Sequence, residues 1–367
     1  MKKTTFPIAV MQEIFRSSEL DKPTLANCCL LSRKYLKLAK KWLYHDIHIR
    51  LPGKNFQGLE GRLFVHEYSR SAARLLSVLQ AKPALGRLVR SISVGEYGGR
   101  LSGIRTEGGD AVASFFALAP NLDTLDLTFR EQWVQGALRQ LDVDRFHRIE
   151  EVRIQNLSHL SSNFLTQLHN LRRLYISRIP DHLRPPSLAT WILQTLSLSA
   201  LPGAEDFNLR SFLSPVSSTI KDLGIPIEAL FDLKLSTYPQ LERVELFMDR
   251  FEPTEDWLEE ETGGSFCKLF DRCSLLSTLA FHLTHSLSPG VEGRIFGSGG
   301  GLGSYTPGQV SRIEFTNEVS VDRLLLFLYG GFVEELAIGI DWVSEETWKL
   351  VAFMCQDAGV ELIQLAQ

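Results

Sequence analysis

Four cysteine and histidine residues between positions 267 and 285 are the first candidates for chemistry in this 367-residue chain. Cys267, Cys273, His282 and His285 are all zinc-ligand types, but their spacing, C-x5-C-x8-H-x2-H, differs from the tight pairs of zinc fingers. Cys273 and His282 also lie at opposite ends of a short predicted strand, so extended chain separates them. We therefore predict that these residues belong to the fold, and that the protein holds no metal and no cofactor.

The glycine-rich run GSGGGLGSYTPG, residues 297–308, could form a phosphate-binding loop. No Gly-Lys-Ser/Thr follows it, however. In the GxGxxG pattern, Leu302, Ser304 and Thr306 take the place of the third glycine. We therefore expect residues 286–308 to be a flexible, glycine-rich insertion.

Two further patterns match catalytic or redox motifs only in part. Gly263-x-Ser265 lacks the closing glycine of a nucleophile elbow, because Cys267 occupies that position. Cys28 and Cys29 are adjacent, but the five cysteines of the chain are an odd number without regular spacing, so they do not indicate a disulfide framework. We predict that the chain is not an enzyme; an unrecognised hydrolase is the distant alternative.

Charge and hydropathy limit the classes of partner. The chain has 39 Lys and Arg against 43 Asp and Glu, a net charge of −4, which gives no general attraction for nucleic acid. The apolar run from Phe6 to Met11 is too short for a signal sequence, and no apolar stretch approaches the ~20 residues of a membrane span. We expect a cytoplasmic or nuclear protein that binds neither nucleic acid nor membrane.

A repeat of the form apolar-x-x-apolar-x-apolar organises the rest of the chain. Its matches begin at residues 44, 89, 122, 149, 171, 193, 220, 241, 276, 310, 333 and 360. Each match predicts a short strand of period two, and a pattern of helical period precedes many of them, for example in residues 71–80, 111–119 and 346–356.

Strand alternating with helix predicts an α/β solenoid with a parallel sheet. One unit buries too few aliphatic side chains to offset the ordering of its own backbone, so neighbouring units must stack. An ordinary doubly wound α/β enzyme is the competing interpretation, and the large number of short strands argues against it.

The strand motif resembles that of leucine-rich-repeat proteins over approximately Leu85 to Gln367. The resemblance implies an irregular solenoid whose curved parallel sheet carries helices on the convex side. One departure concerns the asparagine that the family places eight residues after the first leucine. Arg130, Ile179 and Asp249 stand at three of these positions.

The amino-terminal segment has an apolar stripe at helical spacing. Cys28, Leu31, Tyr35, Leu38 and Trp42 follow steps of three and four residues, which predicts one helix or two helices in near continuation. We expect that a segment of about 45 residues cannot enclose a core of its own, because it buries too small a fraction of its surface. It must therefore contact the solenoid, a partner, or both.

This segment resembles an F-box over residues 6–49. Phe6-Pro7 stands where the family has Leu-Pro, CCLLSRKY matches the segment containing Val-Ser-Arg-x-Trp, and LAKKWLYHDIHI matches the ending that runs into a repeat strand. Phe6, Ala9 and Tyr35 depart from the family's residues. The resemblance implies that the head binds a Skp-type adaptor through an apolar surface. The residues expected to form or support that surface are Pro7, Ile8, Met11, Ile14, Leu31 and Tyr35.

The strand pattern predicts which side chains line the concave face. If the paired apolar positions of each repeat point inward, the residues between them point out and could contact a protein. The candidates for substrate contacts are Asp126, Arg153, Tyr175, Arg243, Glu245, Phe247 and His282.

The sequence thus predicts a helical head in residues 1–50, a connecting segment with the first repeat helix in residues 51–84, and a solenoid in residues 85–367. The resemblances imply the substrate-recognition subunit of a Skp/cullin/F-box ubiquitin ligase, which would bind an adaptor and a protein substrate. The alternative is a stand-alone repeat scaffold whose head only caps the solenoid.

Overall fold

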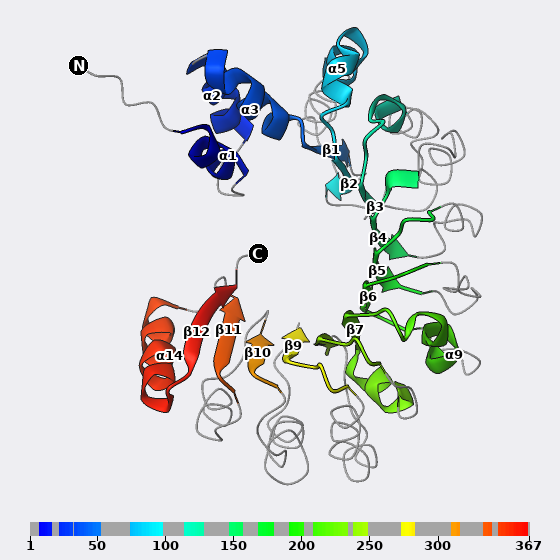
Figure 1. Cartoon of the computed structure of the whole chain (residues 1–367), viewed down its shortest axis with the longest axis vertical. Helices are drawn as coiled ribbons and strands as arrows, with labels where there is room; N and C mark the ends of the chain where they lie inside the picture. The colour runs from blue at the N-terminus through cyan, green and yellow to red at the C-terminus, as the bar shows by residue number, and fades with distance from the viewer. Residues whose placement is uncertain are drawn as a thin grey trace, which may run out of the picture. The chain divides into compact units, whose positions relative to one another are not determined.

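In a computed structural model, the chain divides into two compact units, Met1–Asn170 and Leu171–Gln367, and each is described by itself. Figure 1 labels their helices and strands. The glycine-rich segment 286–308, together with Cys267 and His285, lies outside the described residues. The structure describes residues 7–16, 22–31, 33–52, 74–97, 114–127, 147–156, 168–179, 191–201, 208–233, 238–248, 273–282, 310–315, 333–339 and 344–365.

Three helices open the first unit: α1 (Ile8–Arg16), α2 (Lys22–Leu31) and α3 (Arg33–Leu43). Each contributes one buried side chain to a small common core, and these are Phe15, Leu25 and Ala39. Seven half-buried side chains pack around that core: Met11, Cys28, Cys29, Tyr35, Leu38, Trp42 and Leu43. The expectation that the head encloses no core of its own is therefore wrong, because packing three helices together buries one side chain from each.

The apolar stripe from Cys28 to Trp42 is divided between two helices that fold back on each other. The ammonium group of Lys22, at the start of α2, donates to the backbone oxygens of Trp42 at 3.3 Å and Leu43 at 3.1 Å. The start of α2 thus lies at the end of α3. The spacing predicted either one helix or two helices in near continuation. The structure has two helices, but they run antiparallel.

Four parallel strands follow in the first unit, paired in chain order. They are β1 (Asp46–Pro52), β2 (Ser91–Tyr97), β3 (Thr124–Leu127) and β4 (Glu151–Asn156). Helical residues 74–81 and α5 (Pro83–Gly86) precede β2, and helical residues 114–118 precede β3. Strand and helix alternate here as the sequence predicts.

The second unit continues the same pattern with eight described strands, again parallel and paired in chain order. They are β5 (Arg173–Arg178), β6 (Thr195–Leu198), β7 (Asp222–Pro226), β8 (Arg243–Phe247), β9 (Thr278–His282), β10 (Arg312–Phe315), β11 (Glu335–Gly339) and β12 (Glu361–Leu365). Every predicted strand is present, so the parallel α/β repeat architecture is confirmed.

Short helices connect some strands of the second unit: α9 (Leu209–Leu213), η4 (Ser214–Val216), η5 (Ile227–Leu233) and α14 (Glu345–Ala358). The side chain of Ser344 accepts a hydrogen bond from the backbone of Thr347 and so caps the start of α14. Gly359 ends α14 in the left-handed conformation, with φ 71°. Within the described residues, no helix is both long and apolar enough to cross a membrane.

One backbone contact recurs where the strands begin. The carbonyl oxygen of Arg90, the residue before β2, accepts hydrogen bonds from two consecutive amides of the next repeat, those of Asp123 at 2.9 Å and Thr124 at 3.0 Å. The corresponding carbonyls of residues 45, 123, 172, 194, 221, 242, 277 and 311 each accept two amides in the same way. Every one of these repeats is therefore bonded to its neighbour before the strand starts.

The inward side chains of the strands form a continuous aliphatic core in each unit. Leu125 and Leu127 of β3 are buried, whereas Thr124 and Asp126 between them are half-buried. The same alternation gives the buried pairs Leu174 and Ile176 in β5 and Val244 and Leu246 in β8. At one position where leucine-rich repeats have asparagine, Ile179 is 1% exposed. An apolar side chain therefore fills that turn.

In the last strand, β12, the inward side chains are shifted by one residue from the predicted positions. The sequence match at Val360 predicts that Ile363 and Leu365 point inward. The register instead pairs Leu362 with the inward Leu336 of β11, and Ile363 with Ala337 on the opposite face. The cause is the end of α14, because the amide of Val360 bonds the carbonyl of Cys355 as part of the helix cap.

Polar side chains also join neighbouring repeats just before the strands. The Asn121 amide donates to the carbonyl of Arg87 in the preceding repeat at 2.8 Å. The Asn170 amide donates to the carbonyl of His147, and the Thr219 hydroxyl donates to the carbonyl of Leu193 at 2.8 Å. These contacts satisfy backbone carbonyls of the preceding repeat.

Two glycines should respond differently to alanine. A methyl group on Gly86 would overlap the backbone carbonyl of Leu118 in the next repeat, whereas one on Gly359 meets nothing but forces a left-handed backbone. We expect Gly86→Ala to lower the free energy of unfolding by about 1–3 kcal/mol through overpacking. Gly359→Ala should cost about 1 kcal/mol. Urea unfolding of both variants measures this, and a Gly86→Ala protein as stable as wild type would contradict the contact between these repeats.

Candidate interaction surfaces

The head exposes apolar side chains on the outer side of α1. Pro7, Val10 and Ile14 are spaced three and four residues apart and are exposed, while Met11 and Phe15 on the adjacent stripe face the core. Two stripes of one short helix are therefore apolar, and only one of them is covered. An uncovered apolar stripe of this kind suits a protein partner.

The six predicted adaptor-binding residues fall into three groups. Pro7, Ile8 and Ile14 are exposed and available to a partner. Met11 and Tyr35 are half-buried against the head core, so they support the surface more than they form it. Leu31 belongs to α2, but its side chain lies outside the described residues.

Three exposed apolar residues of the head were not among the predicted adaptor-binding residues. Val10 completes the α1 stripe, Leu36 lies on α3, and Leu30 at the end of α2 has 85% of its surface exposed. Their helical spacing can be read from the sequence. The sequence does not show which of the two apolar stripes of α1 is buried, because that depends on how α1 packs on α3.

The junction between head and sheet is an electrostatic cluster. His45 Nδ1 lies 2.9 Å from Asp46 Oδ1, and Lys22 interacts with Asp46 over a longer range. Burial acts to raise the pKa of Asp46, but the hydrogen bond and charge of His45, followed by the charges of Lys22 and His48, hold this pKa below its ordinary value. Burial also lowers the pKa of Lys22, against the opposing effect of Asp46. The ionised Asp46 thus stabilises the point where α3 passes into β1.

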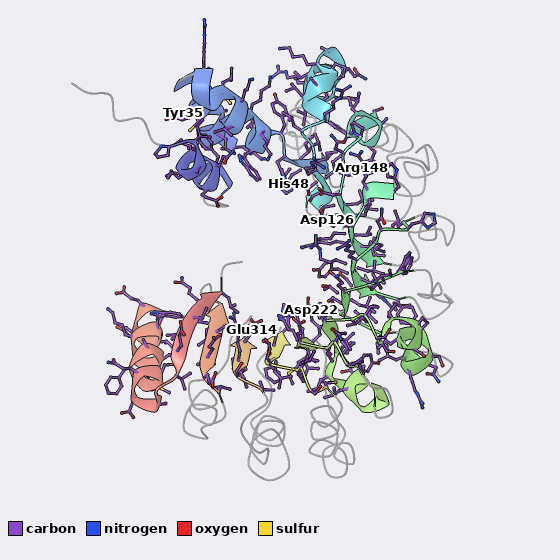
Figure 2. The ribbon with its side chains drawn as sticks, in the orientation of Figure 1. Tyr35, His48, Asp126, Arg148, Asp222 and Glu314 are labelled. Carbon is purple, nitrogen blue, oxygen red and sulfur yellow. The ribbon has the colours of Figure 1, made fainter. Side chains whose placement is uncertain are left out.

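In the first unit, one row of outward side chains crosses the sheet from His48 through Ser93 and Asp126 to Arg153. Figure 2 labels His48 and Asp126 of this row. Arg153 is exposed, and its Nε donates to Glu151 Oε1 at 2.7 Å. Asp126 is half-buried beside it. The two predicted residues, Asp126 and Arg153, therefore share a row and are register partners.

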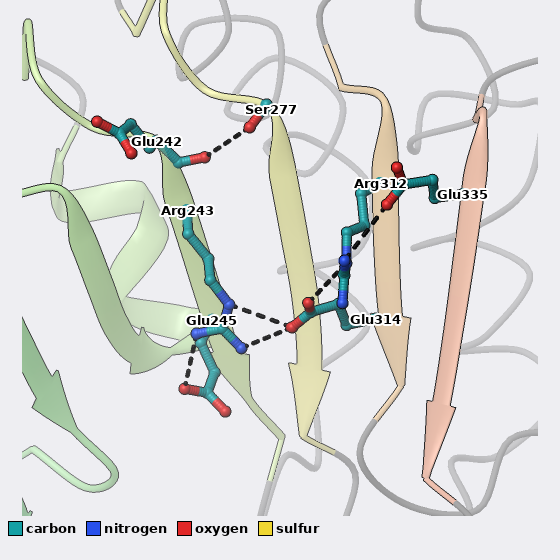
Figure 3. A network of polar contacts seen from close by, with 7 residues as sticks. All are labelled: Glu242, Arg243, Glu245, Ser277, Arg312, Glu314 and Glu335. Atoms are coloured by element: carbon teal, nitrogen blue, oxygen red, sulfur yellow. Dashed lines mark hydrogen bonds and ion pairs between the residues drawn. The ribbon is translucent and has the colours of Figure 1, made fainter. Parts of the chain in front are cut away.

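The second unit carries a chain of ion pairs on its outward face (Figure 3). Arg243 of β8 reaches past β9 to Glu314 of β10, with Nη2 at 2.8 Å and Nε at 3.1 Å from the same carboxylate oxygen. Its Nη1 also donates to Glu245 at 3.3 Å. Burial acts to lower the pKa of Arg243, but the two carboxylates outweigh burial and raise it.

The chain continues along β10 to β11. Arg312 Nε lies 2.8 Å from the second oxygen of Glu314, and Arg312 Nη1 donates to Glu335 at 3.3 Å. Glu314 is only 8% exposed and so depends on both arginines. Its side chain can be reached across β9 because the register partner there is Ala280, which is small and fully buried. Arg243 and Glu245 were predicted to contact a substrate, but Arg243 already pairs with both Glu245 and Glu314 within the protein.

Aromatic side chains lie beside this network at the ends of the strands. The rings of Phe247 and His282 meet edge to face with centroids 5.4 Å apart. The Phe247 ring also lies over Gly224, where a methyl group would come within about 3.0 Å of it. Phe247 is buried, whereas Tyr175 on β5 and His282 remain half-buried and accessible.

Of the four cysteine and histidine residues that could bind a metal, the structure describes Cys273 and His282, which lie on either side of the β9 core. Among the residues described, no three His, Cys, Asp or Glu side chains form a metal-binding group. Cys273 is buried before β9, and His282 ends that strand. Cys28 and Cys29 pack against the head core, where burial, with a smaller effect of Cys28, raises the pKa of Cys29. Burial raises the pKa of Cys355 to about 11, which makes this thiol a poor nucleophile.

Comparisons with known proteins gave no match. A scan against protein-family models gave no match, and a search of curated proteins found no similar sequence. The function must therefore be argued from the surfaces themselves.

The Asp46 cluster predicts a pH dependence. The folded-state pKa is lowered, so ionised Asp46 contributes stability above the ordinary aspartate pKa of about 3.9, and this contribution disappears as the pH falls through the folded value. We expect Asp46→Asn to be less stable than wild type at pH 6 and the difference to shrink toward pH 3. Urea unfolding at several pH values checks this, and a constant difference would contradict it.

We expect two substitutions of basic residues to have different effects on the free energy of unfolding. Arg243→Met leaves the buried Glu314 with one partner fewer, so we expect a loss of about 1–3 kcal/mol in the free energy of unfolding. Lys221→Met removes an exposed pair with Glu242 (2.7 Å), and we expect no measurable change. If Glu314→Gln restores no stability to Arg243→Met in a double-mutant cycle, the two residues are not coupled.

Proposed function

We propose that this chain is the substrate-recognition subunit of a Skp/cullin/F-box ubiquitin ligase. The head would bind a Skp-type adaptor, and the repeat sheet would bind the protein to be modified. The chain itself makes and breaks no bond in this proposal. It increases the rate of transfer by holding the substrate near the enzymes of the complex.

The observation that supports the proposal most is the uncovered apolar stripe of Pro7, Val10 and Ile14 on a three-helix head. The head has its own core, so this stripe is not needed to complete it. The last helix passes directly into the first strand of the sheet, because α3 ends at Leu43 and β1 begins at Asp46. This is the join that the F-box resemblance implies.

The outward face of the second unit suits a protein substrate. Tyr175 and His282 provide accessible aromatic contacts, and tyrosine often anchors protein interfaces. Ile363 and Leu365 of β12 also lie on this face, because the last strand is shifted by one residue. These two residues were not among the predicted contacts, so we add them to the proposed surface.

The alternative, a repeat scaffold whose head is only a cap, predicts that the α1 stripe binds no adaptor. Co-expression with a Skp-type adaptor distinguishes the two. We expect wild type to copurify with the adaptor, and Pro7→Ala with Ile14→Asp to lose it, because a buried carboxylate without a partner is strongly unfavourable at an apolar interface.

The matched control is Phe353→Asp. Phe353 lies on α14 in the second unit and is 66% exposed, so this variant introduces the same charge at another exposed apolar site. It should retain the adaptor. Adaptor binding that survives the double substitution in α1, or that is absent from a folded wild type, contradicts the ligase proposal and leaves the scaffold.

A further inference from the structure

A second surface of the head is basic and lies on α3. Arg33, Lys37 and Lys41 are exposed and Lys40 is half-buried. At about 100° per residue these four positions fall within roughly one third of the helix circumference. The opposite side of the same helix packs against the head core through Tyr35, Leu38, Ala39 and Trp42.

The charge of this face is not balanced locally. α3 contains no acidic residue, and residues 7–52 hold eight Lys and Arg against four Asp and Glu, although the whole chain carries −4. In the described part of the head the acidic residues are Glu13 and Asp46, and Asp46 is paired with His45. No described carboxylate forms an ion pair with Arg33 or Lys37.

This arrangement weakens the helix that carries it. Arg33 and Lys37, and again Lys37 and Lys41, are like charges four residues apart, and such pairs are destabilising. The fold therefore gains nothing from the charges of Arg33 and Lys37, whereas Lys41 lies over the Trp42 ring, 5.0 Å from its centroid. A surface that is unfavourable in the free protein and favourable beside negative charge is expected at a binding site.

The surroundings of the face select one class of partner. A membrane is disfavoured, because the apolar side of α3 is covered by the head and cannot insert. Single-stranded nucleic acid usually stacks on exposed aromatic rings, but Tyr35 and Trp42 are held against the core. The exposed side chain at the border of the basic face is instead aliphatic, Leu36.

We propose that the basic face of α3, defined by Arg33, Lys37, Lys40 and Lys41, docks an acidic segment of a protein that also places an apolar side chain on Leu36. This inference does not depend on the ligase proposal. The α1 stripe and the α3 face belong to different helices, and one can be occupied without the other.

The test uses the full chain and two fluorescent probes, a peptide of repeating Glu-Glu-Leu and a single-stranded oligonucleotide of equal charge. We expect the peptide to bind more tightly at low ionic strength, with an affinity that falls as salt is added. Arg33→Gln with Lys37→Gln and Lys41→Gln should weaken binding by about tenfold. The matched control replaces three exposed arginines of the second unit, Arg172, Arg178 and Arg210, with glutamine and should bind as wild type does.

A single substitution separates binding from a structural role. Lys37→Glu converts two repulsive pairs into attractive ones, so we expect an equal or higher Tm together with weaker peptide binding. A lower Tm with unchanged binding would overturn the proposal. So would an equal loss in the control variant, tighter binding of the oligonucleotide, or no binding of the peptide at low ionic strength.

Discussion

Each strand of this protein obtains its hydrogen-bond partners from the neighbouring repeat. Within each unit a carbonyl just before one strand accepts two amides that precede the next, and the strands then pair in parallel and in chain order. A single repeat has too few buried aliphatic side chains to be stable alone. The backbone hydrogen bonds between neighbouring repeats therefore set the register that aligns the outward side chains in rows.

This constraint explains why the outward face of the second unit can hold buried charge. Glu314 is almost fully buried, yet two arginines reach it from β8 and β10 because the parallel register brings Arg243 and Arg312 into the same row. The small Ala280 leaves room for the Arg243 side chain to cross β9. The network therefore joins three strands, β8, β10 and β11, across β9 on the outward face. This is the face that we propose for substrate binding, and the rings of Phe247 and His282 lie beside the network.

The strands could be predicted from the sequence, because a strand buried on one face repeats with period two whatever its neighbours are. The phase of β12 could not, since Gly359 and the cap of α14 decide where that strand begins. The candidates Arg243 and Glu245 were placed on the correct face from their alternation. The pairing of Arg243 with Glu314 across β9 could not be predicted, because it relies on the small side chain of Ala280 between them. In the head, the spacing from Cys28 to Trp42 predicted a stripe, but not the return of α3 against α2 that Lys22 stabilises.

We infer that the head of this protein is a docking module, because α1 leaves Val10 and Ile14 exposed on a helical unit with its own core. Hydrogen exchange of the full chain with and without a Skp-type adaptor tests it most directly. We expect added protection in the α1 segment, residues 7–16, while the buried strands β2 and β3 exchange at unchanged rates. Unchanged exchange across residues 7–43 at saturating adaptor would contradict the claim.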